Sequence, residues 1–270
     1  MNFVAGLHRN MPASTYHSIE AMSASGAKKM LRSPQHYLLA RTTPSVPSPA
    51  MLFGTAVHAG VLEPDTFNDA VVVAPEVNKR SKDGKAELEA FAAANAGKVV
   101  LSPEDFDRAA LCIESVRRHP AAAQLLDGGE REVSLLWHDG KYKVPCKSRV
   151  DAMNHGGQID LKTTRDASPE GFGKEIANYL YHLQAAFYCS AAEHVLDASP
   201  KFFAFIAVES EPPFAVACYV LPSNAILAGA HLADIALSRY ADALSAGEWP
   251  GYPEEISVIK LPAWATKFNV

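Results

Sequence analysis

The chain has 270 residues, a length that suits one elaborated α/β domain or two smaller domains. Its 48% hydrophobic and 20% charged residues can bury a large core, which excludes a disordered chain and a collagen-like fibre. With 25 Lys and Arg against 30 Asp and Glu, the net charge of −5 excludes a polycation that coats nucleic acid along its whole length. A locally basic groove is still allowed.

The sequence shows no sign of a membrane span or of a secretory leader. It holds no run of about eighteen apolar residues, and its start lacks the basic stretch and apolar core of a signal peptide. We therefore expect a cytoplasmic protein without a membrane partner. The four cysteines form no Cys-x-x-Cys pair, so we expect buried, reduced thiols and neither structural zinc nor an iron–sulfur cluster.

The N-terminal part of the chain is predicted to be mainly helical. Ser23 and Ser33 are typical of helix N-caps, and each precedes a segment with helical character. The Pro- and Ser-rich segment 42–49 predicts a surface loop. Apolar residues at near-helical spacing then predict a third helix over 52–62, with His58 in its middle.

The C-terminal part combines strands and helices. The pattern changes to strands from Arg131, and apolar residues at a spacing near 3.6 predict a helix over 170–194. Two apolar runs at 202–208 and 214–221 predict two more strands. A last helix over 223–244 is predicted, capped by its first residue, a serine.

This order of elements indicates a single domain. Sheet-forming segments lie between helical ones, which is typical of an α/β fold of the α+β type. We therefore interpret residues 1–270 as one domain. We expect 1–125 to form a mainly helical lobe that carries His58, and 126–270 to form the sheet core with its flanking helices.

Two neighbouring segments around residue 155 predict an antiparallel hairpin. Each alternates apolar and polar residues, and the four-residue segment 154–157 between them suits a hairpin loop. The charged residues that share a face are Lys147, Arg149 and Asp151 in the first strand and Asp160 and Lys162 in the second. The hairpin is therefore expected to have one charged face and one apolar face.

Symmetric pairing about this loop predicts a metal site. It places Asp151 opposite Asp160, with Arg149 and Lys162 forming the next pair on the same face. Opposed β-carbons lie about 4.5–5.5 Å apart, so both carboxylates can bind one hard divalent cation. The alternative is a solvated charged face. The facing acids, the lysine two residues after the second acid and the apolar opposite face favour the metal site.

These residues resemble the core motif of the PD-(D/E)XK nuclease superfamily. In that motif a short spacing separates a first acid, here Asp151, from an acid-x-Lys triplet, here 160–162. With Gly54-Thr-Ala-Val-His58 upstream and Gln184-x-x-x-Tyr188 downstream, the pattern is similar to the RecB-type branch. Val150 stands where the superfamily pattern has proline.

Further segments along nearly the whole chain resemble phage-type RecE, or exonuclease VIII-like, nuclease domains. They are Ser23-Ala-Ser25, Ser33-Pro34, KRSKDGKAE at 79–87, GQIDLKTT at 157–164 and QAAFY at 184–188. The resemblance implies a restriction-endonuclease-like core, with a mixed central sheet flanked by helices and with helical N-terminal additions. It also implies a metal-dependent deoxyribonuclease, a 5′-to-3′ exonuclease on double-stranded DNA ends in phage-type recombination.

The resemblance has implications for partners as well. It implies a single-strand annealing protein as a partner and a ring-shaped homo-oligomer. A DNA-binding or scaffold protein that keeps the fold without cutting, and an endonuclease of the same superfamily, remain the alternatives.

The motif residues suit phosphodiester hydrolysis with one or two Mg²⁺ or Mn²⁺ ions. A divalent cation holds the phosphate and activates water, and Asp151 and Asp160 are the expected ligands. By resemblance, the carbonyl oxygen of Leu161 adds a ligand. Lys162 is expected to position or deprotonate the attacking water, or to stabilise the developing charge.

Four further residues are candidates for the same site. By its place in Gly-x-x-x-His, His58 is expected to be a ligand, and its nitrogen suits Mn²⁺ better than Mg²⁺. Glu132 is either another acid of the site or a charge at a strand start. Gln184 and Tyr188 share one helical face, where they either support the site or contact DNA, or merely flank the core.

Basic residues are the candidates for DNA contact, because phosphates are bound by such clusters. The strongest local run is Lys79, Arg80, Lys82 and Lys85, for which a solvated loop is the alternative, and Lys147 and Arg149 are expected to line the site. Nothing resembles a helix-turn-helix or a zinc finger, so reading of a base sequence is not expected.

Overall fold

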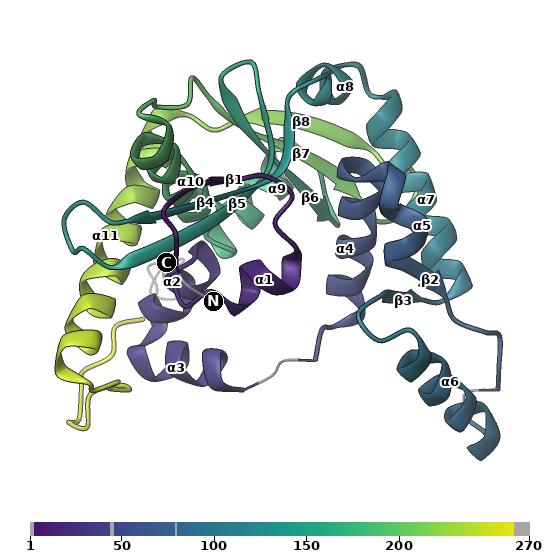
Figure 1. Ribbon diagram of the computed structural model, residues 1–270, viewed down its shortest axis with the longest axis horizontal. Coiled ribbons are helices and arrows are strands. Elements are labelled where there is room, and N and C mark those ends of the chain that lie inside the picture. The colour runs from purple at the N-terminus through teal and green to yellow at the C-terminus, as the bar shows by residue number, and fades with distance from the viewer. Residues whose placement is uncertain (1–2, 44–45, 79, 262–270) are drawn as a thin grey trace, which may run out of the picture.

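A computed structural model describes residues 3–43, 46–78 and 80–261 of the chain. Its centre is a six-stranded mixed sheet in the order β1-β4-β5-β6-β7-β8 (Figure 1). The strands are β1 (Gly6–His8), β4 (Glu130–His138), β5 (Pro145–Asn154), β6 (Gly157–Thr164), β7 (Phe203–Glu209) and β8 (Val216–Val220). Only β6 and β7 pair in parallel, and the other neighbours in this sheet are antiparallel.

Helices cover both faces of this sheet, which confirms the predicted mixed α/β class (Figure 1). One face packs against α2 (Ala24–Arg32), α10 (Tyr181–Leu196) and α11 (Ser223–Ala246). The other packs against α4 (Pro49–Leu62), α7 (Pro103–Arg118) and α8 (Pro120–Leu126). Successive side chains of β6 point to opposite faces of the sheet. Ile159 and Leu161 pack on the side of α4 and α7, whereas Gln158 contacts α10 on the other side.

The remaining elements lie at the margins of the sheet. They are α1 (Ala13–Ser18), α3 (Pro34–Thr42), the 3₁₀ turn Pro64–Thr66, α5 (Phe67–Ala70), α6 (Lys82–Ala94) and α9 (Pro169–Asn178). A separate two-stranded parallel sheet joins β2 (Val71–Val73) to β3 (Val99–Leu101). Figure 1 shows α6 at the edge of the molecule, beyond this small sheet. The short strands β1, β2 and β3 were not predicted from the sequence.

The predicted caps and most predicted elements are present. The hydroxyls of Ser23 and Ser33 accept backbone N–H groups of the first turns of α2 and α3. The helix that carries His58 is α4 and begins at Pro49, three residues before its predicted start. In α11, Ser223 is the first helical residue, and Pro222 takes the cap position that we predicted for the serine.

The helix predicted over 170–194 is wrong in one respect, because the chain forms two helices there. Leu180 adopts φ 53°, in the left-handed region that an α-helix excludes, and it separates α9 from α10. Apolar residues continue at helical spacing across this break. The periodicity therefore gave no sign of it.

The predicted register of the hairpin is confirmed close to its turn. Strands β5 and β6 pair as Ala152↔Ile159, Met153↔Gln158 and Asn154↔Gly157. The ladder ends at the first of these pairs, so the expected direct pairs between Asp151 and Asp160 and between Arg149 and Lys162 do not form. The two strands separate instead, and the candidate site lies at this point.

No helix within the described ranges combines the length and the apolar character that crossing a lipid bilayer requires.

Helices α10 and α11 pack together through a glycine. A β-carbon added to Gly229 of α11 would lie 2.0 Å from the carbonyl oxygen of His182 in α10. We expect Gly229→Ala to lower the free energy of unfolding by about 1–3 kcal/mol, because the helices must move apart. Urea denaturation measures this. The control is Gly173→Ala in α9, where nothing lies within 4 Å of the added atom. An equal loss in both variants would contradict the close approach.

Candidate active site

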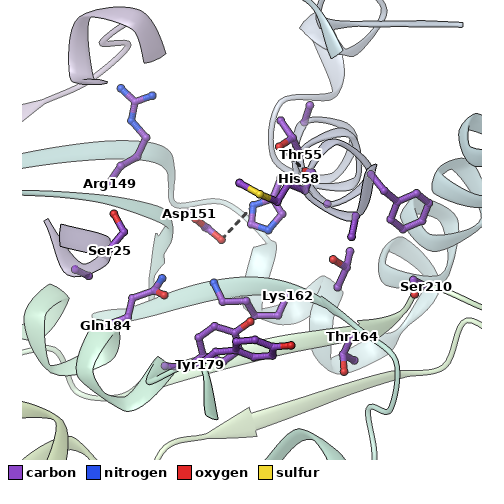
Figure 2. A pocket seen from close by; sticks show the side chains of 18 of the residues that line it. Ser25, Thr55, His58, Arg149, Asp151, Lys162, Thr164, Tyr179, Gln184 and Ser210 are labelled. Carbon is purple, nitrogen blue, oxygen red and sulfur yellow. Dashed lines mark hydrogen bonds and ion pairs between the residues drawn. The ribbon is translucent and has the colours of Figure 1, made fainter. Parts of the chain in front are cut away.

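An open cleft of about 1270 Å³ lies where β5 and β6 separate. Its walls come from α1, α2 and α4, from the strands β4 to β6 and from the start of α10. Figure 2 shows His58, Asp151, Lys162 and Gln184 directed into this space. Motifs that are far apart in the sequence are therefore brought together.

His58, Glu132 and Asp151 form a group that could hold a divalent cation. One ligand atom from each residue lies within 4.8 Å of the others. His58 Nδ1 is 3.4 Å from Asp151 Oδ2, the contact drawn in Figure 2. The side chains of His58 and Asp151 are 28% and 13% exposed, so an ion could reach the group from the cleft. The two carboxylates suit Mg²⁺ or Mn²⁺, and of these two ions the imidazole nitrogen suits Mn²⁺ better.

Glu132 enters this group through an unusual backbone conformation. Its φ is 50°, in the left-handed region, although it lies within strand β4. In the β4–β5 pairing, Arg131 is opposite Ala152 and Val133 is opposite Val150. Glu132 and Asp151 lie opposite each other between these two pairs, where the regular pairing is interrupted. The acid that faces Asp151 across a strand pair is thus Glu132, whereas the sequence predicted Asp160. A strained residue of this kind is typical of functional sites.

The side chain of Asp151 keeps β5 and β6 apart. Its Oδ2 accepts a 2.8 Å hydrogen bond from the backbone N–H of Leu161 in β6. A side-chain oxygen thus takes the position of the backbone acceptor that a continued ladder would supply. Because the N–H and C=O groups of a strand residue point the same way, the carbonyl of Leu161 faces the same gap. This orientation is compatible with its predicted role as a ligand.

Asp160, which is buried, and Lys162, which reaches the cleft, form an ion pair beside the candidate metal group. Asp160 is 1% exposed, its Oδ2 contacts Lys162 Nζ, and its Oδ1 accepts a 2.6 Å hydrogen bond from Gln184 Nε2. Burial disfavours the charged ammonium, but the carboxylates of Asp160 and Asp151 outweigh it and raise the pKa of Lys162. The structure does not bring Asp160 into the group formed by His58, Glu132 and Asp151.

The two residues of the predicted Gln-x-x-x-Tyr pair take different positions on α10. Gln184 reaches Asp160 directly, as described above, and so holds that carboxylate in place. Tyr188 also lines the cleft, and burial raises the pKa of its phenol well above the usual value. Its backbone carbonyl accepts a hydrogen bond from Gln158 of β6, which ties α10 to the sheet.

Lys147 and Arg149 line the cleft, as predicted, and their contact with DNA stays a prediction. The Lys147 ammonium donates to the carbonyl oxygens of Tyr16 and Ile19, each at 2.8 Å, at the end of α1. The Arg149 guanidinium donates to Ser134 Oγ and to a backbone carbonyl, and it lies 4.6 Å from the Tyr16 ring. Their donors are directed to the protein itself, where they fasten α1 to the sheet.

The described residues of the predicted basic run do not line the cleft. Arg80, Lys82 and Lys85 are exposed at and near the start of α6. Lys79 lies outside the described residues. Contact of this run with DNA stays a prediction.

Sequence reasoning missed several residues of the site. Tyr181 lies between two lysines, with Lys162 Nζ at 5.0 Å and Lys28 Nζ at 5.1 Å from its ring centroid. Burial and the neighbouring Lys162 lower the pKa of Lys28 to about 8. Tyr181 precedes Gln184 by three residues and so shares its helical face, a signal that could have identified it. Lys28 carries no comparable signal, because its place depends on the packing of α2 against α10.

The fold and the arrangement of Asp151, Asp160 and Lys162 define a PDDEXK-like protein. Residues 23–262 match the model of a family described as "PDDEXK-like domain of unknown function (DUF3799)". The chain therefore belongs to this family. No match was found among curated proteins.

The chain is also similar to solved structures. A protein from Eubacterium rectale named "Putative exonuclease" superimposes with a TM-score of 0.64 at 14% identity, over 97% of this chain and 100% of that chain. This likeness shows a shared fold. SSO0001 gives a TM-score of 0.29 at 16% identity, over 79% of this chain and 84% of that chain, which does not define a common fold.

The titration of Glu132 should affect stability. Burial, and next the charge of Asp151, raise its pKa from 4.5 to about 8. Between these values the unfolded chain ionises while the folded protein keeps the proton, so stability without metal should fall as pH rises. We expect a loss on the order of 2 kcal/mol across this window, because partial exposure screens the charge.

Glu132→Gln removes this titration and tests the expectation. Urea denaturation with EDTA at intervals between pH 5 and pH 8.5 should give a flatter profile for the variant than for the wild type. Added Mn²⁺ should raise the melting temperature of the wild type more than that of the variant. Identical pH profiles for the two proteins would contradict the assignment.

Proposed function

We propose that this protein is a metal-dependent deoxyribonuclease that hydrolyses phosphodiester bonds. One observation carries the proposal: His58, Glu132 and Asp151 form a group that could hold a divalent cation, next to the ion pair of Asp160 and Lys162 at an open cleft. Membership of a PDDEXK-like family supports it. The resemblance of the motifs to RecE-type nucleases supports DNA as the substrate.

Each residue has a distinct part in this proposal. His58, Glu132 and Asp151 would hold Mg²⁺ or Mn²⁺, and by resemblance Asp160 and the Leu161 carbonyl would add ligands. A bound ion would supply Lewis-acid stabilisation of the phosphate and a hydroxide at neutral pH. Gln184 fixes the Asp160 carboxylate, which in turn fixes the Lys162 ammonium. The fixed ammonium lines the cleft, where it could contact a substrate phosphate.

The charge of Lys162 favours one of its predicted roles. Because neighbouring carboxylates raise its pKa, Lys162 stays protonated at neutral pH and is a poor base. It therefore suits stabilisation of charge on the pentacoordinate phosphorus and orientation of the attacking water.

The finer features of the proposal rest on the resemblance to RecE-type domains. We infer 5′-to-3′ exonuclease activity on double-stranded ends in phage-type recombination, with a single-strand annealing partner and a ring-shaped homo-oligomer. The name of the Eubacterium rectale protein is consistent with exonuclease activity. The exposed Arg80, Lys82 and Lys85 would contact the DNA backbone outside the cleft.

Cleavage of linear DNA in Mg²⁺ or Mn²⁺ should depend on the ion pair and the candidate metal group. We expect Lys162→Ala and Asp151→Asn each to lower the rate at least about 100-fold, because each variant loses a group that helps to stabilise the negative charge of the transition state. Lys174→Ala is the matched control, since that lysine is exposed on α9, where it forms an ion pair with Glu170. Wild-type protein that leaves DNA intact in both metals would favour the scaffold alternative.

The form of the substrate tests the exonuclease assignment. End-labelled linear duplex should be shortened from its 5′ ends, whereas closed-circular DNA of the same sequence should remain intact, because the enzyme needs an end. Gel analysis of both substrates measures this. If the protein nicks closed-circular DNA as fast as it shortens linear DNA, the exonuclease assignment is wrong and the activity is that of an endonuclease.

A further inference from the structure

Two tyrosines meet in the cleft at the break between α9 and α10. Tyr179 follows the last residue of α9, Leu180 adopts the left-handed conformation, and Tyr181 begins α10. Their ring centroids are 5.6 Å apart with an angle of 33° between the ring planes. Both residues line the cleft, and Figure 2 shows Tyr179 below Lys162 in that view. The helix break therefore places an aromatic pair beside the proposed catalytic lysine.

The two rings differ in how they are held. Tyr181 is half-buried and packs at 5.9 Å from Phe205 and 6.3 Å from Phe172, which belong to the core. Tyr179 is 57% exposed, and its ring contacts that of Tyr181 in the cleft. One ring is thus anchored in the core and supports a second whose surface faces solvent. The mechanism described above gives Tyr179 no part.

Positive charge lies next to this aromatic pair. The ammonium groups of Lys162 and Lys28 are 5.0 and 5.1 Å from the Tyr181 centroid. Arg165, which follows β6, is exposed and also lines the cleft. An exposed ring beside cations matches the way proteins bind single-stranded nucleic acid, with bases on aromatic rings and phosphates on basic groups.

We propose that Tyr179 stacks on an unpaired base, so that the cleft takes a nucleotide from a frayed or single-stranded DNA end. A base inside a duplex has both faces covered by its neighbours, and it must leave the stack before a protein ring can reach a face. The inference rests on the proposed nuclease function. It adds that the DNA strand bound in the site is unpaired at its end.

Binding without cleavage gives the first test. The probe is a single-stranded oligonucleotide with 2-aminopurine at its 5′ end, mixed with protein and Ca²⁺, a hard cation that takes oxygen ligands. Stacking on Tyr179 should quench the fluorescence in the wild type and in Tyr179→Phe. Tyr179→Ala should lose the quenching and bind about tenfold more weakly. The control is Tyr252→Ala, because Tyr252 is 62% exposed and does not line the cleft.

Cleavage of modified ends gives the second test. The substrates are duplexes whose 5′-terminal nucleotides are either normal or abasic, with the same phosphates. The wild type and Tyr179→Phe should prefer the normal end about tenfold, and Tyr179→Ala should cut both at similar rates. An unpaired normal end should also be cut faster than a fully paired one by the wild type.

The outcomes separate this inference from the proposed function. If the wild type cuts DNA but Tyr179→Ala keeps both the quenching and the preference for normal ends, the stacking role is wrong and the nuclease assignment stands. If the wild type cuts no substrate in Mg²⁺ or Mn²⁺, the proposed function itself fails. Equal effects of Tyr179→Ala and Tyr252→Ala would also overturn the stacking role, since a general effect would then explain both.

Discussion

The candidate site depends on one hydrogen bond, from the backbone N–H of Leu161 to the carboxylate of Asp151. This bond replaces a main-chain pair and lets two hydrogen-bonded strands part without leaving that amide unsatisfied. Through this gap, His58 on the α4 side of the sheet comes close to Lys162 on the α10 side. A continuous sheet would keep these two sets of side chains on opposite faces.

The interior of the sheet supplies the rigidity that the site needs. Asp160 is buried and the side chain of Lys162 is 15% exposed, and each compensates the charge of the other, so that neither is left as an isolated ion. The amide of Gln184 fixes the second oxygen of the carboxylate. This chain of contacts links the position of α10 to the position of the ammonium, and the same helix carries the aromatic pair.

Local patterns predicted much of this architecture. The two-residue period of β5 and β6 fixed their register at the turn, and the acid-x-Lys spacing correctly placed Asp160 and Lys162 on one face. The separation at Asp151 was not predictable, since it depends on a side chain that replaces a backbone acceptor. The opposition of Glu132 and Asp151 depends on pairing with β4, and the break at Leu180 leaves the apolar periodicity intact. Both are set by long-range packing.

The attachment of α1 has a consequence for access to the cleft. This helix has six residues, too few to be stable alone in water, and its end is held by the buried ammonium of Lys147. One wall of the cleft is thus a short segment that depends on contacts with the sheet, chiefly those of Lys147 and Arg149. Local opening of that wall would therefore cost less free energy than global unfolding, and it would widen the cleft.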